Sequence, residues 1–391
     1  LYAVRRLLSQ FFSSKGLMSI AGLLLFVANP YFLDFFGLCR GYALAASFAT
    51  LSVSFLISGS INKNERHLWV AYILAILASY ANFTLLLFWG ATSIYLAIYH
   101  ISVHRKCLAE LTKKLGALAV VGVCYMALII TPLRKMTSSG QFEYWSSNGF
   151  FKGTVFSLVE SWKYGAVVPL DISTATVASI VVGLFILSWL LVLVRWFSVR
   201  SEVRTLFSPM SVGLTVLSVT VLVNILQCWI MDTPDLFGRT GLFLYPLFAI
   251  VILGLLQAMQ KKGNYWLNSI VALALSVILI GHFAKTYSHK NVREWWFDEN
   301  TLEVLDYLDR TRGDNPVSLK THWLFHPSFH FYTVSGKTPW LHLHGYDKEI
   351  DITTDAKYYY LESADAEILE KEFDRVAVFN SRWLLKRKSQ P

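Results

Sequence analysis

The chain has 391 residues, of which 54% are hydrophobic and only 16% are charged, and its formal net charge is +9 at pH 7. A soluble domain carries about a quarter of its residues as charged side chains, so this composition excludes a wholly soluble globular protein. The positive charge does not indicate a nucleic-acid partner, because Lys and Arg of membrane proteins gather in cytoplasmic loops. The composition predicts a protein whose neighbours are membrane lipids.

Nine apolar runs have the length of helices that cross a bilayer, for which about 20 residues suffice. They are 17–33, 42–60, 68–80, 83–100, 115–131, 176–194, 208–230, 241–259 and 265–284. The stretch 68–100 is too long for one crossing, so we divide it at Tyr80-Ala81-Asn82 into two short helices. The sequence thus predicts a polytopic α-helical transmembrane domain over residues 1–284.

The distribution of basic residues predicts the orientation of these helices. With the N-terminus inside, the inner loops hold fourteen Lys and Arg residues and the outer loops hold six, which are Arg40, Arg134, Lys135, Lys152, Lys163 and Arg239. The positive-inside rule favours this arrangement. Nine crossings then place residues 285–391 outside the cytoplasm.

The outer loop 132–175 contains an amphipathic stretch, Phe150–Tyr164. Long structured loops are usually functional, and an amphipathic helix here is expected to lie along the outer membrane interface. Aromatic rings with nearby carboxylates suit a sugar, and the candidates for acceptor or sugar contact are Glu143, Trp145, Trp162 and Lys163. A lid that contacts no substrate is an equal alternative.

Residues 285–391 have the composition of a small soluble α/β domain. Asp298-Glu299-Asn300 is expected to cap a helix whose apolar positions are Leu302, Leu305 and Leu308. The remaining predicted elements are strands at Val317–Leu319, Lys357–Leu361 and Val376–Phe379, and a helix at 365–373.

Three histidines of this domain, His322, His326 and His330, recur every four residues. One helical face could present them to a metal ion, but Pro327 interrupts such a helix and no carboxylate is spaced with them. We therefore interpret them as part of aromatic packing and assign no metal ligand.

Two arginines in predicted outer turns are candidates for binding a lipid phosphate. Arg40 lies between the first two apolar runs, and Arg239 lies in the turn that begins at Asp232. A guanidinium forms paired hydrogen bonds to phosphate oxygens. Anchoring at a helix end, or an ion pair with Asp34 or Asp235, is the alternative and is the more common role of such arginines.

The stretch Ala28–Ala45, ANPYFLDFFGLCRGYALA, resembles a segment of integral-membrane glycosyltransferases of the GT-C fold. These are the glycosyltransferase family 39-like enzymes, related to protein O-mannosyltransferases and bacterial aminoarabinose transferases. The hairpin Trp69–Tyr99 and the run from Phe237-Gly238-Arg239 to Tyr245-Pro246 look like theirs as well. A helical membrane domain followed by a small outer domain is also their plan.

The resemblance implies a hexosyl- or pentosyltransferase of a bacterial cytoplasmic membrane. Such enzymes move a sugar from a polyprenyl-phosphate donor to a lipid, glycan or protein acceptor at the outer leaflet, usually by direct displacement with inversion. The residues implied at the donor phosphate are Arg40, Tyr42 and Arg239. The need for a divalent metal ion stays open.

The resemblance assigns no catalytic base to this chain, because the family's acidic loop would precede Leu1. Either an N-terminal portion precedes these residues or this copy is inactive alone. A non-catalytic or polymerase/ligase-type component of cell-surface glycan assembly or export is the alternative function.

Overall fold

The computed structural model describes residues 1–12, 16–38, 41–139, 149–164, 172–198, 207–261, 264–288, 290–347 and 354–388. The chain divides into two compact units, Leu1–Tyr287 and Ser288–Pro391. This division falls close to the boundary that the sequence predicts after residue 284. Each unit is described by itself below.

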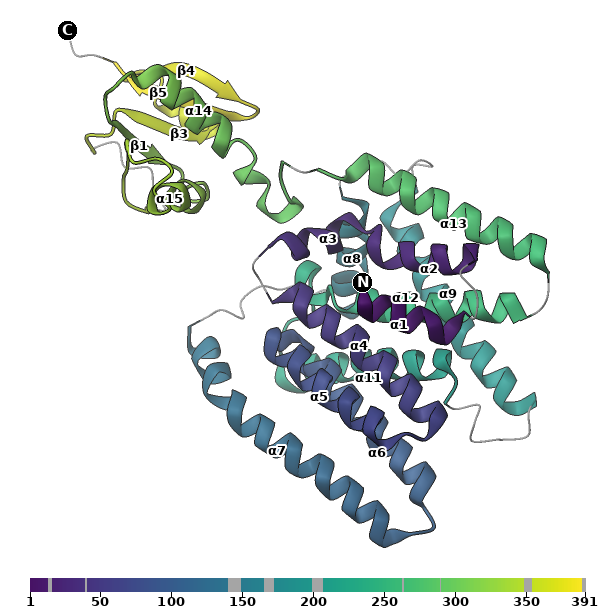
Figure 1. Ribbon diagram of the computed structural model, residues 1–391. Coiled ribbons are helices and arrows are strands. Elements are labelled where there is room, and N and C mark those ends of the chain that lie inside the picture. The colour runs from purple at the N-terminus through teal and green to yellow at the C-terminus, as the bar shows by residue number, and fades with distance from the viewer. Residues whose placement is uncertain are drawn as a thin grey trace. The chain divides into compact units, whose positions relative to one another are not determined.

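The regular elements described in the first unit are helices and short helical turns (Figure 1). Its helices are α1 (Tyr2–Phe11), α2 (Leu17–Val27), α3 (Pro30–Gly37), α4 (Tyr42–Asn62), α5 (Glu65–Ala81), α6 (Leu86–His104), α7 (Leu108–Ser138), α8 (Phe156–Lys163), α9 (Thr174–Ser198), α11 (Pro209–Met231), α12 (Leu244–Lys261) and α13 (Tyr265–Thr286). Short turns of helix lie at η1 (Phe83–Leu85), η2 (Phe151–Val155) and η3 (Gly238–Gly241).

Seven helices of the described residues are long and apolar enough to cross a membrane, or eight if the bent pair α2 and α3 is one span. The sequence predicts nine, and the difference lies at two places. Residues 17–33 do not form one straight helix, because Asn29 caps α3 by accepting a hydrogen bond from the Phe32 N–H, and the chain bends by 58° there. Helix α5 has 17 residues, which is short for a crossing.

The outer helices of this unit expose apolar side chains rather than charges. Within an apolar stretch of 18 residues in each helix, 17% is buried inside the protein in α9, against 61% in α4. Exposed residues on α7 and α9 include Val120, Val123, Leu128, Ile186, Leu190 and Val194. Apolar faces of this extent suit lipid, so the first unit is that of a multi-pass membrane protein.

The helix break that the sequence predicts near Asn82 is confirmed. Helix α5 ends at Ala81, and the Asn82 side chain accepts hydrogen bonds from the backbone and hydroxyl of Thr84 at the start of η1. Helix α7 continues through Pro132 to Ser138, beyond the apolar run 115–131 that the sequence shows. Its last turns are polar, so hydropathy alone does not reveal them.

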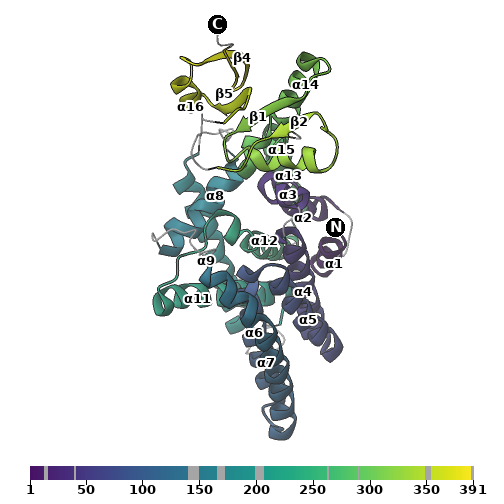
Figure 2. The ribbon, with the colours of Figure 1, turned by 90° about the vertical axis from the view of Figure 1, so that its left-hand side faces the viewer.

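The second unit contains a five-stranded sheet with helices on both faces. Its elements are η4 (Arg293–Asp298), α14 (Thr301–Arg312), β1 (Val317–Thr321), α15 (His326–Val334), β2 (Leu341–Leu343), β3 (Tyr358–Glu362), α16 (Ser363–Ile368), β4 (Phe373–Phe379) and β5 (Arg382–Arg387). The strand order is β2-β1-β3-β5-β4. Strand β1 is parallel to β2 and β3, and the other pairs are antiparallel. Figure 2 shows α14 and α15 on the side of the sheet away from α16.

The three predicted strands are confirmed, whereas several details of the predicted helices are wrong. Leu302 is 57% exposed, and Val304 packs in the core with Leu305 and Leu308. The predicted helix 365–373 ends at Ile368, because Phe373 begins β4 and packs against Tyr359 with ring centroids 4.8 Å apart. Helix α15 begins only at His326 with Pro327 in its first turn, so no single helix carries His322, His326 and His330, as the sequence predicts.

Candidate functional site

One end of the first unit gathers α3, α8, η3 and the starts of α4 and α12; we call it the α8 end. Helix α8 and the preceding η2 are attached to the loop between α11 and α12. The Thr154 hydroxyl donates to the Leu236 carbonyl at 2.6 Å, and the Gly238 N–H donates to the Ser157 hydroxyl at 2.9 Å. The amphipathic stretch predicted from the sequence is therefore helical and holds a second segment of the chain in place.

That second segment carries Arg239 on the tight turn η3. The Phe237 N–H donates to the Thr240 hydroxyl at 2.8 Å, which closes the turn. Gly238 has φ of +50°, a conformation that favours glycine, and it is buried between the turn and α8. Arg239 itself is half-buried. The turn and α8 together fix the backbone position from which the Arg239 side chain extends.

Two tyrosine hydroxyls connect the helices around this end. The Tyr164 hydroxyl at the end of α8 donates to Asp34 Oδ2 on α3 at 2.7 Å. The Tyr245 hydroxyl of α12 donates to the Leu25 carbonyl at 2.5 Å, where α2 approaches its bend. Backbone and side-chain acceptors inside a membrane domain require such donors, and these bonds join α3 to α8 and α2 to α12.

The structure places four of the seven predicted site residues at the α8 end, and the other three, Arg40, Glu143 and Trp145, lie outside the described residues. The Tyr42 ring packs on Phe35 with centroids 4.8 Å apart. The Lys163 ammonium donates to the Thr174 hydroxyl, 3.3 Å away, and that hydroxyl donates to a Glu160 oxygen at 2.6 Å.

The fourth residue, Trp162, contacts a histidine that sequence reasoning missed. The rings of Trp162 and His282 have centroids 4.4 Å apart, and His282 Nε2 lies 2.8 Å from the Trp162 carbonyl oxygen. His282 belongs to α13 and is 3% exposed. The sequence signal that could have pointed to His282 is a single histidine within the last apolar run, 265–284. Trp162 is thus held against α13, which favours a structural over a substrate-binding role for this ring.

A separate group of polar residues lies at the carboxyl ends of β1 and β2 in the second unit. Lys320 is 3% exposed, donates to the Gly345 carbonyl at 3.0 Å and pairs with Asp347. His344 Nε2 lies 2.6 Å from the Ser318 hydroxyl, and His326 Nε2 lies 3.0 Å from the His344 carbonyl oxygen. The ring nitrogens of His326 and His344 therefore bond to protein groups.

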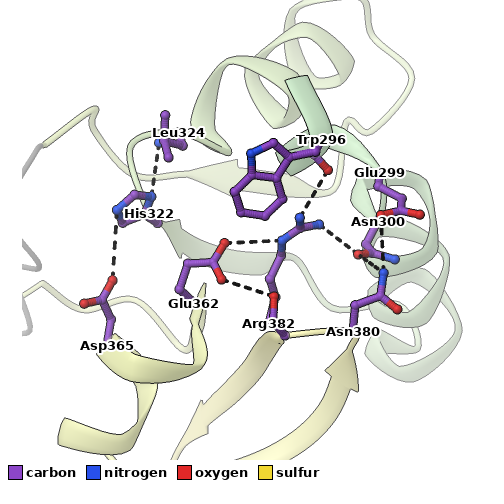
Figure 3. Close-up of polar contacts among 10 residues, drawn as sticks. Trp296, Glu299, Asn300, His322, Leu324, Glu362, Asp365, Asn380 and Arg382 are labelled. Atoms are coloured by element: carbon purple, nitrogen blue, oxygen red, sulfur yellow. Dashed lines mark hydrogen bonds and ion pairs between the residues drawn. The ribbon is translucent and has the colours of Figure 1, made fainter. Parts of the chain in front are cut away.

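Arg382, which the sequence did not mark, organises the polar interior of the second unit (Figure 3). Its guanidinium is 1% exposed and donates to Asn300 Oδ1 at 2.8 Å, to the Trp296 carbonyl at 3.1 Å and to Glu362 Oε1 at 3.4 Å. It also lies over the Trp296 ring, 4.8 Å from the centroid. The charge is therefore paired and hydrogen-bonded, as a buried arginine requires.

The histidines predict that the second unit loses stability in mild acid. Burial lowers the pKa of His322, His326 and His344 below the usual range for histidine, and for His322 the carboxylates of Asp365 and Glu362 act in the opposite direction. A lowered pKa in the folded state means that the unfolded chain binds more protons, so stability is full above about pH 6.5 and falls as the pH drops through the folded-state pKa values.

Hydrogen exchange of the full-length protein, corrected for intrinsic rates, is expected to show weaker protection of residues 317–347 at pH 5.5 than at pH 7.5. Peptides from α4 serve as the internal control. His344→Gln should reduce the pH effect. Equal protection of 317–347 at both pH values would contradict the prediction.

No protein-family model matches this sequence, and no curated protein matches it. A function is therefore inferred from the chemistry of the α8 end and from the sequence of residues 28–45. Of that segment, the structure describes 28–38 and 41–45.

Proposed function

We propose that this protein is a membrane glycosyltransferase that moves a sugar from a polyprenyl-phosphate donor to a lipid, glycan or protein acceptor at the outer face of the membrane. The donor phosphate binds at the α8 end, where Arg239 contacts it. The observation that supports this most is the attachment of the Arg239 turn to α8 through Ser157 and Thr154.

The chemistry of the transfer explains why a fixed cation is useful. The acceptor hydroxyl attacks the anomeric carbon, the bond from that carbon to the phosphate oxygen breaks, and polyprenyl phosphate leaves with an additional negative charge. A hydrogen-bond donor that is held in place before the reaction stabilises this charge without reorganisation. Arg239 meets this requirement because both sides of its turn are hydrogen-bonded. We assign no residue of this chain as the base that accepts the hydroxyl proton.

The position of the site also suits a lipid-linked donor. The prenyl chain stays in the bilayer, so its phosphate lies at the level where apolar helices end. Helices α11 and α12 end and begin around the Arg239 turn, and amphipathic α8 packs beside it. The orientation predicted from the basic residues assigns this end to the outer leaflet of a bacterial cytoplasmic membrane.

Full-length protein in liposomes tests the proposal, with synthetic polyprenyl-phosphate hexoses and pentoses as donors and release of polyprenyl phosphate as the readout. Arg239→Ala should lower the release rate by about 10²- to 10³-fold. This is the usual effect of removing one hydrogen-bond donor to a negative charge that develops in the transition state. Arg134→Ala is the matched control, because Arg134 is an exposed arginine on the last turns of α7 and should leave the rate unchanged.

A loss of release in Arg239→Ala with an unchanged thermal stability supports the phosphate contact. Wild-type protein that binds the donor but releases nothing would instead favour the non-catalytic role in glycan assembly or export. Equal release rates by wild type and Arg239→Ala would remove Arg239 from the site.

A further inference from the structure

A second cluster of chemically active groups lies at the end of the helix bundle opposite the α8 end. It contains Glu65 in the first turn of α5 and His100 and His104 in the last turns of α6. Glu65 Oε1 lies 4.0 Å from His100 Nδ1 and 3.7 Å from His104 Nε2. One ligand atom from each of the three residues lies within 4.8 Å of the others.

One buried atom of each residue in this cluster lacks a hydrogen-bond partner. His100 is 2% exposed, and its Nδ1, His104 Nε2 and Glu65 Oε2 are each shielded from solvent without such a bond. A buried polar atom without a partner destabilises the folded protein. The two unpartnered ring nitrogens both face Glu65 Oε1, which indicates that something else lies between these three atoms in the working protein.

The local structure sets the three side chains in this arrangement. The Asn64 side chain accepts hydrogen bonds from the backbone N–H groups of Arg66 and His67, so α5 begins at Glu65. His100 and His104 are four residues apart on α6 and therefore share a face of that helix. Their rings are nearly parallel, at 26°, with centroids 5.7 Å apart.

Lys114 of α7 is a cation that contacts this cluster and needs an explanation. Its ammonium lies 3.3 Å from Glu65 Oε2 and 3.6 Å from Glu110 Oε1. The Glu65 carboxylate therefore faces Lys114 with one oxygen and the two imidazoles with the other. A cation bound between Oε1 and the imidazoles would leave the pair with Lys114 in place, although the two positive charges would repel each other.

We propose that Glu65, His100 and His104 bind one divalent transition-metal ion, and that the ion is Zn²⁺. Two imidazoles and one carboxylate are a common ligand set of zinc, which leaves the fourth tetrahedral position to water or another ligand. Magnesium and calcium prefer oxygen ligands throughout. Tetrahedral zinc with bonds of about 2.0–2.1 Å needs ligand atoms roughly 3.3 Å apart, so small side-chain rotations close the observed distances.

The ion links α5 to α6 at the end that the basic residues assign to the cytoplasm. The site is independent of the glycosyltransferase proposal, because its residues lie at the other end of the bundle. A failure of one proposal leaves the other intact.

Zinc titration of full-length protein, with the affinity tag removed and bound metals stripped by a chelator, tests this site. Wild type is expected to bind one zinc ion per chain and to gain thermal stability. Replacing a residue that only hydrogen-bonds a metal ligand weakens metal binding by about 10- to 100-fold. Glu65→Gln and His104→Ala replace ligands themselves, so each should weaken zinc binding at least that much. His67→Ala is the matched control, since His67 lies two residues from Glu65 and contacts Ser58 at 2.9 Å instead.

Two further measurements keep the test decisive if a variant folds poorly. Wild-type protein loaded with Co²⁺ should show the intense visible absorption of a tetrahedral site, and zinc should abolish it. Lys114→Met should bind zinc as tightly as wild type or more tightly, because a repelling charge is gone. Zinc binding that is the same in wild type, Glu65→Gln and His104→Ala, or the absence of the cobalt absorption, would overturn the proposal and leave an ion-pair cluster only.

Discussion

Replacing Arg382 by methionine is expected to destabilise the second unit by about 3 kcal/mol or more. Methionine fills much of the space, but it removes the guanidinium donor from Asn300 Oδ1, the Trp296 carbonyl and the Glu362 carboxylate. Arg382 opens β5 and faces Glu362 on β3, so the loss should loosen both strands together with the start of α14. Hydrogen exchange of β3 and β5 amides in the full-length protein measures this effect.

Arg375→Met is the matched control for this experiment. Arg375 lies on the neighbouring strand β4, is exposed, and contacts the Trp383 ring at 4.3 Å from the centroid. An exposed contact of this kind contributes less than about 1 kcal/mol. If both variants show the same exchange as wild type in β3 and β5, the buried network is not what holds these strands.

The features that the sequence predicted are those encoded within one helix or turn. The long apolar runs predicted the helices of the first unit, and the Tyr80-Ala81-Asn82 turn predicted the break between α5 and α6. The bend between α2 and α3 also has a local cause in Asn29, yet hydropathy averages over it. Short strands such as β2, with only three residues, have too few positions for a pattern.

The features that the sequence did not predict arise where distant segments meet. Gly238 and its partner Ser157 are 81 positions apart, and Trp162 and His282 are 120 apart. No local sequence pattern predicts contacts between residues this far apart. The spacing of His100 and His104 is visible in the sequence, but Glu65 joins them only because α5 and α6 form a hairpin.

Gly41→Ala is expected to disrupt the first unit more than any other substitution of a glycine in its described part. A Cβ at residue 41 would lie 1.9 Å from the Ala81 carbonyl oxygen, which belongs to the backbone at the end of α5. A side chain could rotate away, but here α4 and α5 would have to separate at their ends. Overpacking usually costs about 1–3 kcal/mol, and a clash with backbone should reach or exceed the upper end of that range. A lower melting temperature and a lower yield of monodisperse protein measure the effect.

Gly90→Ala separates this steric effect from the general effect of adding a methyl group. Gly90 lies inside α6, and a Cβ there meets no atom within 4 Å, so alanine should keep or raise stability, by up to about 1 kcal/mol. Gly41 also precedes Tyr42, whose ring packs on Phe35 of α3, so the displacement should reach the α8 end. Gly41 then has a packing role, which is to let two helices meet. A Gly41→Ala protein as stable as Gly90→Ala would show that α4 and α5 do not approach this closely.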